Sequence, residues 1–548
     1  MIDDTPFQNL LKMIPNNSIP INAKKVRNNV ETLASKVRCE IRDMLKNKII
    51  CLKVDIASIG TRFFLGINCQ YVDGGHIYLK NLAVTEIFQR HTSEHLKDLL
   101  LLNLQRYHID IEQIYCITTD NGANMLKMTN LVNDFQEMNT TPEAGSSSSI
   151  TIYLIDEDAD SDMETGYQEQ TEVEDLTSGV LEQLQAQFLA CDDRPDEKSQ
   201  YPIGVVRCAA HTLQLAIKDA SNNVGNRALL TEVREVVRRI RTPLYVKILK
   251  EENKPVPKLD CSTRWHSAID MVESLLNLKE ICTINERLQL LVSSTPWGAL
   301  EDFVKSMTPA KLLTKKLQKE QLTVGNFYIE WMLCLYKLKN INTETSTTLF
   351  NKMKQRETAL FDNDTFINGI FLDPRVNSIL TPEQLERAKS NLIKLFFKYF
   401  IMEYNTHTSD ASVAELANSG SIEARTDMED FLSSCYINRQ NNLNILIRRR
   451  DPQGEYTTSI KQSINAFLDE PLLKSTEDVL HYWEKSKNKF PLLYKLSKVV
   501  LAAPMTQVSV ERLFSSLKFM VSNYRTSMKD NIIEDLLFLR SYHLFDRS

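Results

Sequence analysis

The chain has 548 residues, of which 43% are hydrophobic and 25% charged, a composition ordinary for a globular protein with several domains. It contains no run of about 18 apolar residues, so we expect no membrane-spanning helix. Its start, M-I-D-D-T-P, does not have the pattern of a signal peptide. Its ten cysteines form no C-x-x-C pair, so we expect reduced thiols in a soluble, intracellular protein.

The net charge of −6 is distributed unevenly along the chain. Residues 139–200 contain 16 Asp and Glu but two basic residues, a local charge of −14, while the remainder carries 63 basic and 55 acidic residues, a net +8. Ten acids without a base between Asp156 and Asp175 predict a disordered acidic loop. This loop is either simply solvated or competes with DNA phosphate for the basic remainder, whose charge permits a nucleic-acid partner without requiring one.

The first part of the chain changes from a helical pattern to a strand pattern. Residues 1–45 have apolar side chains at helical spacing and are predicted to be a partial N-terminal helical region. Residues 46–138 contain three strand-like runs joined by turns, then a helix, a fourth strand and a second helix. This order is expected of a ribonuclease-H-like core of the α/β class, with its first and fourth strands side by side. The predicted strands cover residues 49–58, 62–72, 76–84 and 114–120.

Two aspartates lie at the ends of the strands that are expected to be neighbours. Asp55 interrupts the first strand near its end, and Asp120 ends the fourth. A single aspartate in a strand is more often an edge or turn residue. A pair that meets at neighbouring strands instead suits Mg²⁺, a hard cation that prefers oxygen ligands.

A second ordered stretch begins after the acidic loop. Residues 201–224 continue the core with a short strand and a helix that carries Cys208 and His211. A Cys-x-x-His pair is half a zinc site, but no second pair has ligand spacing, so we expect no structural zinc. Residues 225–480 have helical periodicity almost throughout, with a flexible loop at 405–428, and are either an insertion into the core or a separate domain. Their first helix has an arginine face that is either solvated or suited to phosphate contacts.

The run D-C-S-T-R-W-H-S at 260–267 contains Arg264 and Trp265. By default this tryptophan is a core residue. Beside a nucleic acid, the same side chain is a stacking platform for an unpaired base, an interaction that contributes about 1–3 kcal/mol.

The C-terminal region, residues 481–548, is predicted to be helical. Thr506 and Ser509 are candidate caps for an amphipathic helix that carries Glu511 in its first turn. Taken alone, this glutamate is a solvated carboxylate stabilised by the positive end of the helix. Residues 531–544 form a broad apolar face suited either to packing or to self-association.

An ordered set of motifs across most of the chain resembles the transposases of the hAT superfamily. The motifs are V-D-I-A-S, I-T-T-D-N-G-A-N-M, R-C-A-A-H-T-L-Q-L, S-T-R-W-H-S, L-D-P-R, W-E-K, F-P-L-L-Y-K-L-S-K, S-V-E-R-L-F-S and L-L-F-L-R. The resemblance implies that Asp55, Asp120 and Glu511 form an acidic triad on a ribonuclease-H-like fold, which the helical region at 225–480 interrupts. Such a triad would hold two Mg²⁺ (or Mn²⁺) ions about 3.5–4 Å apart for DNA cleavage and strand transfer.

The resemblance also implies roles for other residues. Cys208 and His211 match an element near the active site, and Arg264 and Trp265 match a pair in which the tryptophan supports a flipped base. The family's dimerisation region corresponds to residues 481–548, with its matched residues in the helix near the end of the chain: Leu536, Leu537, Leu539 and Arg540. The implied partners are the DNA of transposon ends and further copies of the chain, the implied location is the nucleus, and no membrane is involved.

The chain also departs from the family pattern. Full-length members commonly begin with a BED zinc finger, and this sequence has none, which indicates either a truncated gene or a domesticated copy. Asp55 is followed by I-A-S-I-G-T in place of the usual Gly-Trp-Thr-Ser. Three alternatives therefore remain open: an active DNA transposase, a catalytically inactive nuclear DNA- or chromatin-binding protein, and a dimerising scaffold.

Overall fold

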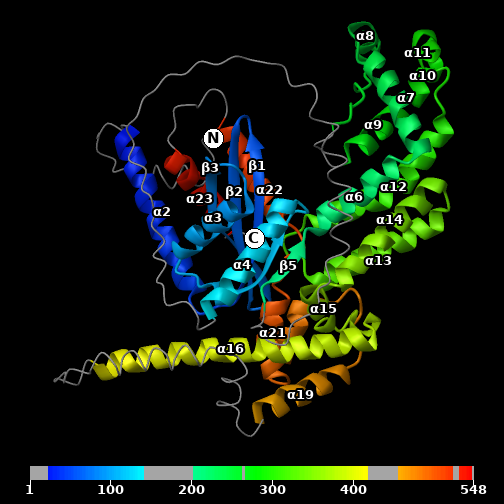
Figure 1. Ribbon diagram of the computed structural model, residues 1–548. Helices are drawn as coiled ribbons and strands as arrows, with labels where there is room; N and C mark the ends of the chain where they lie inside the picture. Colours follow the sequence, from blue (N-terminus) through cyan, green and yellow to red (C-terminus); the bar gives the residue numbers. More distant parts are fainter. Residues whose placement is uncertain (1–22, 141–201, 262–265, 417–454, 522–529, 546–548) are drawn as a thin grey trace.

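A computed structural model describes residues 23–140, 202–261, 266–416, 455–521 and 530–545 of the chain. These residues form a mixed α/β structure in which many helices surround one five-stranded sheet (Figure 1). The strand order is β3-β2-β1-β4-β5; the first three strands pair antiparallel, and β4 and β5 run parallel to β1. The strands are β1 (Ile50–Ile59), β2 (Arg62–Asp73), β3 (His76–Ile87), β4 (Ile114–Thr119) and β5 (Gly204–Arg207).

The strands form where apolar and β-branched residues are concentrated, because such side chains pack well on a pleated surface. The predicted strands at 49–58, 62–72 and 114–120 agree with β1, β2 and β4 to within one residue at each end. The third strand continues past the predicted end at residue 84, because its last residues pair with the start of β2 (Ile87 with Phe63). All six residues of β4 are buried, as expected of a strand covered on both faces.

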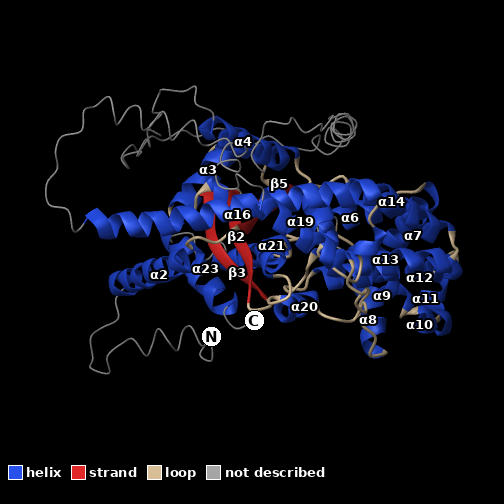
Figure 2. Ribbon diagram, turned by 90° about the horizontal axis from the view of Figure 1, so that it is seen from below, coloured by secondary structure: helices blue, strands red, loops and turns tan. Residues whose placement is uncertain are grey.

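Four helices cover one face of the sheet: α2 (Ala23–Leu45), α3 (Ser93–Gln105), α4 (Ala123–Thr140) and α23 (Asp530–Phe545). Their apolar side chains share one buried cluster with residues of β1 to β4. Figure 2 shows α3 and α4 on one side of the sheet and α2 with α23 nearby. The first and last described helices of the chain therefore belong to the same layer.

The opposite face of the sheet carries the chain segment between α21 (Pro491–Val500) and α22 (Val508–Met520). Side chains of the sheet donate hydrogen bonds to its backbone: Gln70 to the carbonyl of Ala502 at 2.9 Å, and Thr118 to that of Pro504 at 2.5 Å. Because both carbonyl groups are buried, these bonds satisfy acceptors that water cannot reach. Residues nearly 400 positions from β4 are thereby fixed on its surface.

Most of the remaining helices form a block beside the sheet, on the right of Figure 1, while α16 (Pro382–Leu416) and α19 (Glu455–Leu468) lie along the bottom of that view. A continuous cluster of buried side chains joins this block to the sheet through Cys51, Tyr115, Cys116 and Val206. The helices are α6 (Ala209–Ser221), α7 (Val224–Ile240), α8 (Pro243–Glu251), α9 (Ser267–Leu276), α10 (Lys279–Ile284), α11 (Glu286–Leu291), α12 (Trp297–Leu317), α13 (Val324–Ile341), α14 (Glu344–Phe361), α15 (Asp364–Phe371), α16 (Pro382–Leu416), α19 (Glu455–Leu468) and α20 (Val479–Ser486).

The L-D-P-R turn that follows α15 contains a buried ion pair. Asp373 is fully buried, and Arg375 donates two hydrogen bonds to its carboxylate, at 2.8 and 2.5 Å, and a third to the carbonyl of Glu477 at 2.9 Å. The side chain of Asp373 packs directly against Gly325 of α13. This turn therefore links α13, α15 and the segment before α20.

Some predicted features differ or cannot be compared. Helix α16 continues to Leu416, past residue 405 where a loop was expected; its added residues include no proline or glycine to end it. Most of the acidic stretch at 139–200, as well as Arg264 and Trp265, lies outside the described residues. Of the helices that are described, none has the length and apolar character needed to cross a membrane.

Candidate active site

Asp55 and Asp120 meet at adjacent strands. In the parallel pairing of β1 with β4, Lys53 is opposite Thr118, so two residues further on Asp55 is level with Asp120, which directly follows β4. The side chain of Asp55 is buried, and its Oδ1 accepts a hydrogen bond from the backbone N–H of Ile56 at 3.0 Å. The Oδ1 of Asp120 accepts one from the N–H of Gly122, also at 3.0 Å.

Glu511 approaches this pair from the helix α22. Asp55 is the direct partner of Gly66 on β2, so both residues project to the same face of the sheet. A Cβ atom on Gly66 would lie 2.5 Å from Cγ1 of Val510 and 2.9 Å from Cζ of Phe514. The absence of a side chain at Gly66 lets the first turn of α22, which carries Glu511, lie against this face.

Three polar residues at the start of α22 hold the helix in place. Asn68 of β2 donates to the hydroxyl of Ser509 at 3.2 Å, and the side chain of Gln507 donates to the carbonyl of Val54 on β1. The hydroxyl of Thr506 donates to a carbonyl at the end of α12 at 3.3 Å. The prediction that Thr506 or Ser509 caps the helix is therefore wrong: neither makes a cap hydrogen bond, since both bond to neighbouring elements.

The carboxyl groups of Asp55 and Glu511 lie in an environment that disfavours negative charge. Burial raises the pKa of Asp55 well above its usual value, and the charges of Asp120 and Glu511 raise it further. Burial also raises the pKa of Glu511, whose Oε1 is buried and finds no hydrogen-bond partner among the described residues. The structure thus brings the three acids into electrostatic contact. In the described ranges, however, no three or more His, Cys, Asp or Glu side chains are close enough to hold a metal ion as they stand.

Cys208 and His211 lie beside the acids. The N–H of Cys208 donates to the carbonyl of Thr119 at 2.9 Å, which places the start of α6 next to the end of β4. Burial raises the pKa of the Cys208 thiol to about 12, and the charge of Glu511 adds to this effect. Burial lowers the pKa of His211, while the charge of Asp120 opposes that shift. Cys208 is therefore a neutral thiol at physiological pH, and His211 lies within electrostatic reach of Asp120.

A buried lysine close to the acids was not predicted. Lys53 is on β1, two residues before Asp55 and on the same face, and only 6% of it is exposed. Burial lowers the pKa of Lys53 to about 8, while its electrostatic neighbours include Cys208, Glu320 and Arg512. No described residue forms a hydrogen bond or an ion pair with its ammonium group. The sequence pattern that could have revealed it is a lysine in an otherwise apolar strand, two residues before Asp55 and therefore on the same face.

The predicted dimerisation residues lie on α23. Leu537 is 1% exposed and packs with residues of α22, and Leu539 is 7% exposed in the cluster under α2. Leu536 is partly buried, and Arg540 is exposed. Most of this apolar face is therefore covered by the same chain.

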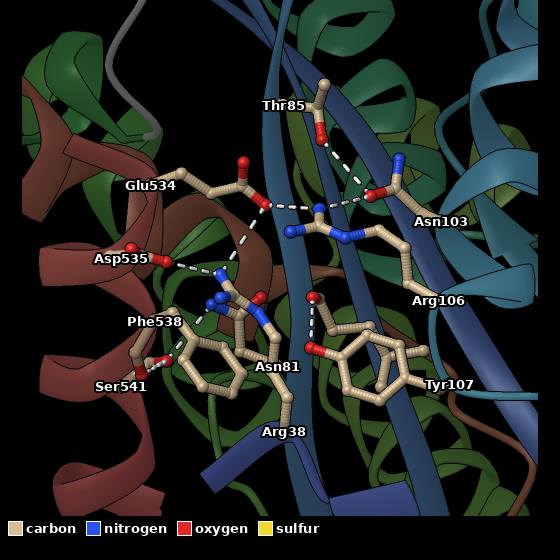
Figure 3. A network of polar contacts seen from close by, with 11 residues as sticks. Arg38, Asn81, Thr85, Asn103, Arg106, Tyr107, Glu534, Asp535, Phe538 and Ser541 are labelled. Carbon is tan, nitrogen blue, oxygen red and sulfur yellow. Dashed lines mark hydrogen bonds and ion pairs between the residues drawn. The ribbon is translucent and has the colours of Figure 1, made fainter. Parts of the chain in front are cut away.

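Polar contacts complete the docking of α23 (Figure 3). They join it to α2, α3 and β3, and the side chains concerned are mostly buried or half-buried. The pairs are Arg38 with Asp535 (2.6 Å), Arg106 with Glu534 (2.7 Å) and Asn81 with Ser541 (3.0 Å). The last helix is thus part of the layer that covers the sheet.

Comparison with known proteins supports the family resemblance. Residues 463–542 match the model of the hAT family C-terminal dimerisation region. The chain is 24% identical to human "Zinc finger BED domain-containing protein 4" over 357 residues, which cover 61% of this chain and 29% of that protein. It is 21% identical to a "Putative AC transposase" of Zea mays over 366 residues, covering 62% and 44%. It is also 22% identical to "Zinc finger BED domain-containing protein DAYSLEEPER" of Arabidopsis thaliana over 331 residues, which cover 54% of this chain and 42% of that protein. The matched part of this chain therefore spans less than half the length of each of these three relatives.

Proposed function

Since this chain is related to the hAT transposases and carries their C-terminal dimerisation region, we propose that it is a DNA transposase that cleaves and transfers DNA strands with Asp55, Asp120 and Glu511. The observation that carries the proposal is the convergence of these acids. Asp55 lies in the middle of β1, and Asp120 directly follows the adjacent parallel strand β4. The third acid reaches the same face from a helix nearly 400 residues later in the chain. Asp55 interacts electrostatically with both Asp120 and Glu511.

A ribonuclease-H-like core is part of this proposal. Its support is the strand order β3-β2-β1-β4-β5, in which an antiparallel meander is extended by two parallel strands. In this interpretation the helical block between β5 and α21 is an insertion, and α22 returns the chain to the core with its catalytic glutamate. The two buried hydrogen bonds from the sheet to the segment before α22 support that connection.

The three acids suit a hard divalent cation. Their groups are carboxylate oxygens, each aspartate has one backbone N–H partner, and Glu511 Oε1 is buried without a partner. A pair of Mg²⁺ or Mn²⁺ ions would supply an activated oxygen nucleophile and stabilise the leaving oxygen. The protein's own contribution is to hold the acids rigidly: the paired strands fix Asp55 and Asp120, and the anchors of α22 fix Glu511. We expect small movements of these side chains on binding, since the acids do not yet surround one point.

Beside the acids, Cys208 and His211 are the proposed supporting residues, and Arg264 with Trp265 remain proposed DNA contacts. Lys53 is buried on the face that carries Asp55. A cation at this depth would attract a phosphate more strongly than an exposed one, because less water screens it. We expect the chain to act in the nucleus, on the DNA of transposon ends and as a dimer or larger oligomer, for which the matched dimerisation region is the support.

A cleavage assay tests the proposal. Purified full-length chain is incubated with Mn²⁺ and a DNA duplex that carries the terminal repeats flanking its own genomic copy. We expect strand cleavage, with a loss of at least about 10³-fold in Asp55→Asn and in Glu511→Gln, because each removes a group acting in the transition state. Glu235→Gln, a surface acid paired with Arg238, is the control and should retain activity.

The second candidate is a DNA-binding or self-associating protein without catalysis. It is favoured by the names of several relatives, which call them zinc finger BED domain-containing proteins. In that case the chain would bind DNA or form dimers in a mass measurement, but no cleavage would occur with Mn²⁺ in the wild type. Equal cleavage by wild type and both acid variants would refute the catalytic role of the triad outright.

A further inference from the structure

A groove with an excess of positive charge lies next to Glu511. Its volume is about 540 Å³, and it is formed between the end of α12 and the first turn of α22. Arg512, the residue after Glu511, lines it, and the hydrogen bond from Thr506 to the carbonyl of Leu317 joins the two helices at this point. The lining residues are Lys315, Gln318, Lys319, Glu320, Gln321 and Arg512.

Two lysines in this groove have no acidic partner. Lys315 and Lys319 are exposed, and no described carboxylate lies within ion-pair distance of either. Their neighbours along α12 are different: Lys311 contacts two carboxylates at 2.6 Å each, and Lys316 contacts Glu330 at 2.6 Å. Near this end of α12, Lys311 and Lys316 are therefore neutralised by acids, whereas Lys315 and Lys319 at the groove have no described acidic partner.

The only acid in the lining is already neutralised. Glu320 pairs with Arg512 at 2.7 Å, and Arg512 also donates to the carbonyl of Gln318 at 2.6 Å. This pair fixes the guanidinium beside the groove, and the charge of the lining remains +2. Lys53 adds a further positive charge in electrostatic contact with Glu320 and Arg512.

The lysines follow one another along the last part of α12 and just past its end. Lys311 and Lys315 are one turn apart on α12, about 6 Å along its axis, and Lys319 lies just past the last residue of that helix, Leu317. At one end of this series, the groove is lined by Arg512, the residue after Glu511. At the other end, Lys311 contacts Asp270 and Glu273 of α9, the helix that follows the Arg264–Trp265 pair.

We propose that this groove binds the phosphate backbone of an unpaired DNA strand leading to the acids at Asp55, Asp120 and Glu511. The inference deepens the proposed function and rests on it for the identity of the strand. Arg512, which follows Glu511 in the chain, lines the groove. Its two surplus cations, Lys315 in the last turn of α12 and Lys319 just past the end of that helix, suit successive phosphates of a chain better than one isolated anion. The simpler explanation is that lysines in a last helical turn complement the negative helix end.

A matched pair of variants separates these explanations. Lys315→Gln/Lys319→Gln removes the two surplus charges at the end of α12. Lys337→Gln/Lys339→Gln removes two exposed lysines at the end of α13, where Lys339 also lies in the last turn and no described acid pairs with either. Helix-end stabilisation is lost in both variants, whereas the groove is changed in the first alone.

The assay is fluorescence anisotropy of the full chain with a labelled single-stranded oligonucleotide in EDTA, so that no cleavage occurs. We expect Lys315→Gln/Lys319→Gln to weaken binding about 10-fold at low salt. The slope of log affinity against log salt should fall by about 1.4, because each phosphate contact to a single strand contributes about 0.7. The α13 variant should bind like the wild type. Equal weakening in both variants, or none in the first, would overturn the proposal.

The outcome is independent of whether the acids catalyse cleavage. If wild type cleaves DNA with Mn²⁺ but the Lys315/Lys319 variant binds and cleaves equally well, the groove inference fails and the proposed function stands. If nothing cleaves but this variant still loses its affinity and salt dependence, the groove is supported and the catalytic function fails.

Discussion

Replacement of Gly66 with alanine tests the contact that brings Glu511 to the two aspartates. The added Cβ would lie 2.5 Å from Val510 Cγ1 and 2.9 Å from Phe514 Cζ, where real contacts are rarely under 3.4 Å. Neither neighbour can rotate away cheaply, since Val510 is branched at Cβ and both side chains are buried in the same cluster. Overpacking of this kind destabilises a core by about 1–3 kcal/mol, unless the helix moves.

Movement of α22 would carry Glu511 with it. A shift of several tenths of an ångström to about 1 Å would relieve the overlap, but it would also displace the Glu511 carboxylate from the position that the proposed reaction requires. Such a displacement lowers a reaction rate by up to about 10²-fold. We therefore expect Gly66→Ala to lower the free energy of unfolding and to lose cleavage activity. Urea denaturation gives the first quantity, from a lower midpoint at unchanged slope. Cleavage with Mn²⁺, at a temperature where the variant is folded, gives the second.

The control is Gly298→Ala, the same chemical change in the helix α12. A Cβ at Gly298 has no heavy atom within 4 Å and its backbone needs no glycine, so alanine should stabilise the protein by about 0.5–1 kcal/mol through helix propensity. If Gly66→Ala matched this control in stability and also kept full activity, α22 would not be positioned by close packing on β2.

Three further predictions concern other parts of the molecule. Asp373→Ala should cost about 3–5 kcal/mol in urea denaturation because it leaves Arg375 buried without its partner, and a cost under 1 kcal/mol would contradict burial of the pair. Because the pKa of Asp55 is raised in the folded state, the folded protein keeps a proton on this carboxyl at pH values where the unfolded chain has released it. Without metal, the free energy of unfolding should therefore decrease as the pH rises from the usual carboxyl pKa to the raised one. In thermal melts, Asp55→Asn should weaken this dependence of stability on pH. Mg²⁺ should raise the melting temperature of the wild type but not that of Asp55→Asn, and an equal response of both proteins would contradict the proposed metal site. Deleting residues 140–198 should strengthen DNA binding at low salt if the acidic stretch competes with phosphate, whereas unchanged affinity would reject that competition.

Several features could be predicted because they depend on local pattern. Strands β1, β2 and β4 follow from short apolar, β-branched runs bounded by turn residues, and the order of elements along the chain made Asp55 and Asp120 neighbours. The family resemblance selected Glu511 from an ordinary helix start. The acidic stretch was visible from composition alone.

Other features depend on contacts between distant segments. Thr506 and Ser509 have the chemistry of caps, yet both bond to other elements, because the competing partner in β2 or α12 appears only after folding. The apolar residues of α23 fit either a dimer interface or a core, and periodicity cannot distinguish these uses. In this chain Leu537 and Leu539 lie mostly against α22, α2 and the sheet.

The sequence by itself predicted the candidate residues of the site, which are Asp55 and Asp120 on strands expected to be neighbours and a glutamate in the first turn of a helix, and it showed a mildly basic body. Only the tertiary structure decided that Gly66 admits α22 to the face of Asp55 and that Lys53 is buried beside the acids. It also decided that Lys315 and Lys319 have no acidic partner among the residues that the structure describes. The physical reason is that residue type and spacing set local conformation, whereas burial and charge pairing depend on which distant segments pack together.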